Sequence, residues 1–355
     1  MSGPTPSDTQ SHLYPFLLGQ ATSKDATPLP VPQFPVTDGE KLQLISYFIR
    51  ETGTWCETTD SQMHFTVKCI HEMMKSSSFV SAALSLASRQ LDYIHKRQRP
   101  VTLELYQFTI QLLLRQDPVQ ADTSILATCT LLCVYEMMAS RVEEWRRHLK
   151  GCAGFLRAQR WNGSSEGIVK ASFWAFARID VWAAFISGKA TLIPTESWVD
   201  DMSIGSVLAK GDLDDYCNLA HLIFAKIVNV LATFQNYGRT TRAAMLEAPL
   251  CGLWDAMQEW YRLRPADVCP VLRDFPPSRV FPDVLHARSS PNCGNTFYHA
   301  GCMLLLQTGL VTQGLEPEGI NDIVWHAREL VGTSVSNPSQ YVEQQPLGVF
   351  VGQKD

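Results

Sequence analysis

Apolar residues recur along this chain at the three- and four-residue spacing of an α-helix, and this pattern constrains the fold more than any other feature. Val80, Leu84, Leu91 and neighbouring apolar residues follow the i, i+3, i+4, i+7 pattern across four turns, after a cap region at 76–78. Period-two alternation, which indicates half-buried strands, is nearly absent. The sequence therefore predicts an all-α fold, an irregular multi-helix array without a detectable internal repeat.

Helix-capping and helix-breaking residues divide the chain into further helices. Asp38 is expected to cap the first helix and Asp122 or Thr123 a later one, because these side chains accept free backbone N–H groups. Pro100 and Pro118 are expected to end helices, since proline interrupts the helical backbone. Further helices are predicted over 145–160, 168–188, 219–234, 250–263, 296–310 and 321–331, with a long irregular segment over 265–295.

The segment 168–188 is apolar on nearly every side, which predicts a buried central helix. Arg178 and Asp180 lie within it and cannot pair with each other on the helix surface, so each needs a partner on a neighbouring element. One interpretation is a buried ion pair or network that fixes helix register. The other is an effector pocket bordered by Trp174, Arg178 and Trp182, which together with Asp180 form the candidate site.

The ten cysteines do not follow the spacing of a zinc site or a disulfide framework. Cys129 and Cys133 are four residues apart on a predicted apolar helix, so we expect buried packing. His71 and Glu72 begin like a zinc-protease helix, but Lys75 stands where the second histidine would be needed. The remaining histidines are assigned structural or surface roles, and no metal site is predicted.

Residues 163–167 read Gly-Ser-Ser-Glu-Gly and match the Gly-x-Ser-x-Gly form of a hydrolase nucleophile elbow. That motif works at a sharp turn from a strand into a helix. Here it lies between two predicted helices, so we interpret it as an ordinary turn. Neither common glycine-rich phosphate-binding pattern occurs. The sequence thus predicts no catalytic residue and no cofactor.

Charge and hydropathy exclude several classes of protein. A formal net charge of −5 disfavours direct nucleic-acid binding, which needs clustered Lys and Arg. The N-terminus lacks a secretory signal, and the longest apolar stretch, 125–138, falls short of the ~18 to 20 residues of a membrane span. We expect a soluble intracellular protein without membrane contact. The short basic group at 95–100 is interpreted as a solvated helix end or a nuclear-import signal.

Several segments, in this order, resemble the fungal-specific transcription factor domain, the regulatory region of fungal zinc binuclear cluster transcription factors. The segments are LISYFIRETGTWCETTD, SAALSLASRQLDYI, LLCVYEMM, EWRRHLKGCAGFL, FWAFARIDVWAAFISG, IPTESWVDD, LWDAMQEWYRLRP, TFYHAGCMLLLQ and QQPLGVF. The similarity extends from about Leu42 to the C-terminus. Members of this family read DNA through six cysteines in two closely spaced triplets, and that pattern does not occur among the cysteines of this sequence.

The resemblance implies a domain organisation and a function. The N-terminal prolines predict a disordered Pro/Ser/Thr-rich leader over 1–38. The resemblance implies an all-helical regulatory domain over 39–335 and a C-terminal tail over 336–355. Proteins of this family usually continue with further helices after that region, so truncation of the tail stays open. The implied function is transcription regulation in the nucleus, without enzymatic activity. The expected protein partners are a second copy of the chain or a zinc-cluster transcription factor. A small-molecule effector is a further expected partner.

Two other classes of function stay open at this point. The aromatic residues of the central helix and the proline-rich segment that could cover a pocket are also consistent with a helical small-molecule-binding protein or enzyme of unknown reaction. A third interpretation is a paralogue that serves as a dimerisation partner without reading DNA.

Overall fold

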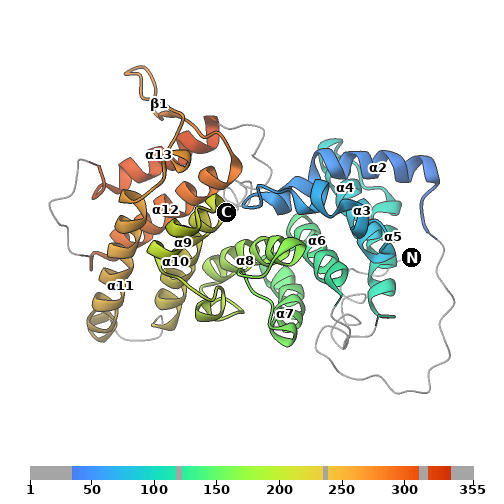
Figure 1. Ribbon diagram of the computed structural model, residues 1–355, viewed down its shortest axis with the longest axis horizontal. Helices are drawn as coiled ribbons and strands as arrows, with labels where there is room; N and C mark the ends of the chain where they lie inside the picture. Colours follow the sequence, from blue (N-terminus) through green and yellow to red (C-terminus); the bar gives the residue numbers. More distant parts are fainter. Residues whose placement is uncertain (1–33, 117–121, 235–238, 312–318, 337–355) are drawn as a thin grey trace, which may run out of the picture. The chain divides into compact units, whose positions relative to one another are not determined.

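The part of the chain that the structure describes folds into helices apart from one small hairpin, which confirms the all-α prediction (Figure 1). The computed structural model describes residues 34–116, 122–234, 239–311 and 319–336. The predicted leader and the predicted C-terminal tail lie almost entirely outside these residues.

The described residues form two compact units. The first unit holds those up to Glu57 and Gln62–Ile179, and the second holds Thr58–Ser61 and those from Asp180 onward. The division falls inside helix α8 (Gly167–Ser187), the predicted central helix. Most of its residues are buried, as its apolar sequence indicated, although Phe185 and Ile186 near its end are exposed. The single domain predicted over 39–335 stays a prediction.

In the first unit, helix α4 contacts α2, α5 and α6. Its apolar stripe includes Phe79, Ala83 and Leu84, none of which is exposed, and burial of each large side chain contributes about 1.5 to 3 kcal/mol. The elements of this unit before α8 are α2 (Asp38–Arg50), η2 (Thr52–Glu57), η3 (His64–Lys68), α3 (Ile70–Met73), α4 (Ser77–Ile94), α5 (Pro100–Leu113), α6 (Thr123–Ala139) and α7 (Val142–Gln159).

Side-chain caps determine where two of these helices begin. Thr37 precedes α2 and its hydroxyl accepts the N–H of Glu40, while the Glu40 carboxylate accepts the N–H of Thr37 at 2.9 Å. This capping box satisfies two backbone donors at once, so Thr37 is the cap and the assignment to Asp38 is wrong by one residue. Asp122 caps α6 as predicted, accepting the N–H of Ser124 at 2.7 Å.

Pro100 begins a helix and does not end one, in contrast to the prediction. Helix α4 already stops at Ile94, and Pro100 is in the first turn of α5, where its missing N–H has no partner to lose. The connection between the two helices is held by Asp92, which accepts hydrogen bonds from Arg99 at 2.5 Å and from Thr102 at 2.6 Å. Pro118 lies outside the described residues.

In the second unit, helices α10 to α13 lie beside one another, with α10 against α11 and α12, and α12 against α13 (Figure 1). Helix α10 is long and apolar enough to cross a membrane by length and composition, but 61% of its apolar window is buried. Such burial is typical of a core helix. The elements after α8 are η4 (Thr195–Ser197), α9 (Ile204–Lys210), α10 (Leu213–Thr233), α11 (Arg239–Arg262), η5 (Ala266–Val268), β1 (Leu272–Asp274), β2 (Asp283–Leu285), α12 (Ser289–Thr308) and α13 (Ile323–Ser336).

Helix α11 continues through Pro249, although the sequence predicted a helix only from residue 250. The proline removes the hydrogen bond to the carbonyl of Met245, a residue on an exposed part of the helix where water can replace the missing donor.

Further along, α11 is joined to α10 by two reciprocal hydrogen bonds. The Tyr216 hydroxyl donates to the carbonyl of Trp260 at 2.6 Å, and the Trp260 indole donates to the carbonyl of Tyr216 at 2.9 Å.

The segment predicted as an irregular excursion contains an antiparallel hairpin and the start of a helix. Strands β1 and β2 pair Arg273 with Val284 at their centre. Helix α12 begins at Ser289 and includes Pro291, which is tolerated because the first turn does not use its N–H. The prediction of an irregular segment over 265–295 is therefore wrong for these parts. The last helix, predicted over 321–331, runs from Ile323 to Ser336.

The short segment Thr58–Ser61 belongs to the second unit although both of its neighbours in sequence belong to the first. Asp214, in the first turn of α10, accepts the backbone N–H of Ser61 at 2.7 Å and its hydroxyl at 2.8 Å. The hydroxyl of Ser290 donates to the same carboxylate. One acidic side chain thus fixes this segment to two helices of the second unit.

Candidate functional site

Trp174 and Arg178, the first two predicted site residues, lie in the part of α8 that belongs to the first unit. Trp174 is 2% exposed and its indole N–H donates to the carbonyl of Gly163 at 3.2 Å. A Cβ on Gly163 would lie 2.7 Å from that ring, so the glycine of the elbow-like motif serves close packing in a turn. Arg178 donates to the carbonyl of Cys56 at 3.3 Å.

Asp180 and Trp182, the other two predicted residues, lie in the part of α8 that belongs to the second unit. Asp180 is fully buried and accepts the backbone N–H of Leu192 at 2.7 Å. The ring of Trp182 packs between those of Phe224 and Phe297, with centroid distances of 5.4 and 5.5 Å. Both charged residues of the candidate site therefore bind backbone groups of other segments, and the effector pocket at these residues stays a prediction.

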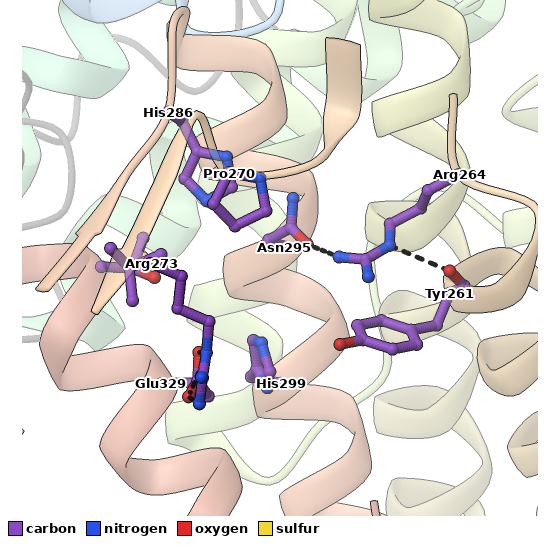
Figure 2. A pocket seen from close by; sticks show the side chains of 10 residues that line it. Tyr261, Arg264, Pro270, Arg273, His286, Asn295, His299 and Glu329 are labelled. Atoms are coloured by element: carbon purple, nitrogen blue, oxygen red, sulfur yellow. Dashed lines mark hydrogen bonds and ion pairs between the residues drawn. The ribbon is translucent and has the colours of Figure 1, made fainter. Parts of the chain in front are cut away.

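A polar cavity of about 250 Å³ lies elsewhere, within the second unit (Figure 2). The end of α11, the hairpin, α12 and α13 each contribute to its wall. The lining residues are Tyr261, Arg264, Pro270, Arg273, Val284, His286, Asn295, His299, Glu329 and Thr333. Because it gathers cations, a carboxylate and histidines around a small space, we treat this polar cavity as the candidate functional site.

Arg264 is held in one orientation by three contacts. Its Nη1 donates to Oδ1 of Asn295 at 2.6 Å and its Nε to the carbonyl of Tyr261 at 2.9 Å (Figure 2). The guanidinium lies 3.5 Å from the centroid of the Tyr261 ring, whose other face stacks on Tyr298. The amide N–H groups of Asn295 donate to the carbonyls of Val268 and Pro291, which fixes its oxygen toward Arg264. A guanidinium has five N–H groups, so three remain for another acceptor.

Arg273 is neutralised within the cavity wall. It comes from β1, and its Nε lies 3.1 Å from both carboxylate oxygens of Glu329 on α13, with a further bond from Nη2. Glu329 is buried, and the hydrogen bonds to its carboxylate raise the pKa of Arg273. This bidentate pair ties the hairpin to α13 and contributes no net charge to the cavity.

The tautomers of His299 and His326 follow from their hydrogen bonds. Nε2 of His326 lies 2.8 Å from the carbonyl of Ile320 and must donate to it, which leaves Nδ1 of His326 as an acceptor. Nδ1 of His299, 2.9 Å away, then donates to that acceptor. Nε2 of His299 is left with a lone pair. This chain of bonds makes His299 a hydrogen-bond acceptor in the cavity wall.

Burial keeps the histidines of this region neutral. Desolvation lowers the pKa of His326 to about 4 and that of His299 well below its usual value, where the neighbouring His326 and Arg264 act in the same direction. Desolvation, with Arg264, lowers the pKa of His286 to about 4. Among the described residues no carboxylate pairs with Arg264, so at neutral pH this side chain supplies the one net charge of the cavity wall.

The described residues contain no group of three or more His, Cys, Asp or Glu placed to hold a metal ion. Cys129 and Cys133 are buried in α6, as expected for packing residues. Burial, with the neighbouring Cys133, raises the pKa of Cys129 to about 12, so this thiol stays protonated and unreactive.

The sequence did not single out the polar cavity. Its histidines were assigned structural or surface roles, and Arg264 directly follows a helix predicted over 250–263. One signal was present, because Asn295 and His299 are four residues apart and so share a face of α12. The other walls come from the hairpin and α13, which are distant in sequence.

The family model of the fungal-specific transcription factor domain matches residues 43–248. The chain belongs to this family. Helices α2 to α10 lie within the match, apart from the first residues of α2, and the residues that line the polar cavity follow it in sequence. The fungal-specific transcription factor domain thus accounts for the first unit and the early helices of the second.

One relative is the transcription activator AMTR1 of Alternaria alternata, which is 22% identical to this chain. The alignment covers 64% of this chain, and the chain spans only 39% of the length of that activator. No solved structure matches the chain.

Proposed function

We propose that this chain is a transcription regulator that acts in the nucleus as a helical regulatory module. The observation that carries the proposal is the match of residues 43–248 to the fungal-specific transcription factor domain. The similarity to a transcription activator and the all-helical architecture support it. The module works by contacts with other molecules and not by catalysis.

Contact with DNA comes from a partner in this proposal. The net charge of −5 and the absence of paired cysteine triplets from the 355 residues leave no basis for direct recognition of phosphates or bases. A zinc-cluster transcription factor supplies this contact. A second copy of this chain is a partner for association and does not supply contact with DNA. Basic residues of the 95–100 group provide a route for import: Lys96 and Arg97 are exposed, whereas Arg99 is engaged with Asp92.

A reporter assay tests this proposal. The full chain, fused to a heterologous DNA-binding module, should change transcription from a promoter with sites for that module several-fold relative to the module alone. A tagged copy should accumulate in the nucleus. Leu149→Asp, which places a carboxylate at a fully buried position of α7, is the unfolded control and should abolish the effect. An unchanged reporter together with an exclusively cytoplasmic tagged protein would contradict the proposal.

The second candidate function is a small-molecule-binding protein, and the polar cavity is the observation that favours it. The two functions are compatible, because a regulator can respond to a bound ligand through a difference in affinity between two states.

A further inference from the structure

We propose that the polar cavity of the second unit binds a small organic monocarboxylate that carries a hydroxyl group at a distance from its carboxylate. Arg264 binds the carboxylate and His299 accepts the hydroxyl. The idea that this binding regulates the protein rests on the proposed function. The binding of the ligand itself does not.

Arg264 is prepared to bind a carboxylate. Its position is fixed before any ligand arrives, by Asn295 on one side and by the carbonyl and ring of Tyr261 on the other. Three of its N–H donors remain available, and a planar guanidinium matches the two oxygens of a carboxylate. Because the side chain is half-buried, water screens this interaction less than on an open surface.

The net charge of the cavity wall favours a ligand with a single negative charge. Arg273 is neutralised by Glu329, and the histidines of the wall are uncharged at neutral pH. A monoanion therefore cancels the charge of Arg264. A dianion would bring a second negative charge near the carboxylate of Glu329 without a free cation to meet it.

The hydroxyl requirement follows from the tautomer of His299. Nε2 has a lone pair because Nδ1 donates to His326. An N–H or O–H of the ligand must meet this acceptor, and an ammonium group would add a positive charge beside Arg264, which leaves a hydroxyl as the better match. Figure 2 shows Arg264 and His299 at separate positions along the cavity, with the Tyr261 hydroxyl directed between them.

The cavity limits the size of the ligand. Its volume of about 250 Å³ lies just below the range of roughly 300 to 1,000 Å³ for pockets that hold drug-sized molecules. A single ring or a short chain between the two polar groups fits this space. Large cofactors and nucleotides do not.

Binding of 4-hydroxybenzoate to the purified full chain tests the proposal by isothermal titration calorimetry. Benzoate lacks only the hydroxyl, and 4-hydroxybenzamide lacks only the charge. We expect affinity to fall about fivefold without the hydroxyl and about tenfold or more without the charge. The flexible 4-hydroxybutyrate serves as a second probe of the same class.

Two variants connect the binding to Arg264. Arg264→Gln should weaken binding of 4-hydroxybenzoate by about tenfold or more while binding of the amide is unchanged. Arg264→Lys keeps the charge without the planar fork and should give an intermediate affinity. Arg262→Gln is the matched control, because Arg262 is exposed on the same helix and does not line the cavity; it should bind like the original chain.

Three results would overturn the proposal. They are no binding of either 4-hydroxybenzoate or 4-hydroxybutyrate, equal binding of 4-hydroxybenzoate and 4-hydroxybenzamide, or unchanged binding of 4-hydroxybenzoate by Arg264→Gln. The ligand comparisons use the unaltered chain, so they decide the question even if a variant fails to fold. None of these measurements involves transcription, so their failure is distinguishable from a negative reporter assay.

Discussion

The turn before α8 makes a quantitative prediction about Gly163. An alanine there would place its Cβ 2.7 Å from Cε2 and Cζ2 of Trp174 and 2.9 Å from Nε1, whereas ordinary carbon contacts lie at about 3.5 to 4.0 Å. Overpacking of this kind costs about 1 to 3 kcal/mol. The lower entropy of the unfolded alanine chain offsets about 0.4 to 1 kcal/mol. From the middle of each range we therefore expect Gly163→Ala to lower the free energy of unfolding by about 1.3 kcal/mol.

Gly39→Ala is the matched control, because it is the same chemical change in the same unit. No atom lies within 4 Å of a Cβ at Gly39, which is in the first turn of α2. Alanine should therefore raise the free energy of unfolding there by up to about 0.5 kcal/mol. Urea unfolding followed by circular dichroism measures both variants.

A double-mutant cycle identifies Trp174 as the cause. Trp174→Phe removes the indole nitrogen and the fused ring that the new Cβ would meet, so Gly163→Ala should cost less in that background. A coupling free energy of about 1 kcal/mol is expected. Our account of the turn is refuted if Gly163→Ala is as stable as the original chain, or if its cost is the same in the Trp174→Phe background.

Two further predictions concern buried charge and pH. Burial alone raises the pKa of Asp92, but hydrogen bonds from Thr102 and Arg99 outweigh it and lower the pKa; the carboxylate therefore contributes stability above about pH 4 that is lost on further acidification. Arg99→Gln should lower the free energy of urea unfolding at pH 7 by about 1 to 2 kcal/mol, a figure reduced for the partial exposure of Arg99. It should also weaken the dependence of stability on acid pH. Arg97→Gln, at an exposed position, is the control and should change neither quantity. His326 has a lowered pKa of about 4, so folding excludes a proton that the unfolded chain binds below about pH 6.5, and stability should fall by on the order of 3 kcal/mol between pH 6.5 and 4. His326→Gln should remove this share of the pH dependence and leave the part that comes from His286 and His299, whose pKa values burial also lowers. A flat profile for the original chain in thermal unfolding would contradict the assignment.

Local sequence patterns predicted the helices well where one signal acts alone. The apolar stripe and serine cap of α4 and the aspartate cap of α6 are determined within a few residues, so they were found. Proline was the ambiguous signal. Pro100 and Pro291 lie in first turns that do not need their N–H, and Pro249 is tolerated inside α11. The same residue thus permits a helix or ends one according to its position in the turn.

The polar cavity could not be predicted because its walls meet only through packing. Arg264 follows α11, Arg273 lies in the hairpin, and Glu329 comes from α13. No spacing along the sequence relates these three residues. The acceptor role of His299 likewise depends on His326 and on the carbonyl of Ile320, which three-dimensional structure alone brings into line.

The placement of Thr58–Ser61 makes the second unit depend on residues encoded far from the rest of it. A protease cut between Ile179 and Asp180 would yield one fragment that carries Ser61 and another that carries Asp214. The two hydrogen bonds between those residues would still connect the fragments. A protein fragment that starts at residue 180 would lack Ser61, so the Asp214 carboxylate would lose two of its hydrogen-bond donors. Dissection of this protein therefore calls for supplying the 58–61 peptide in trans.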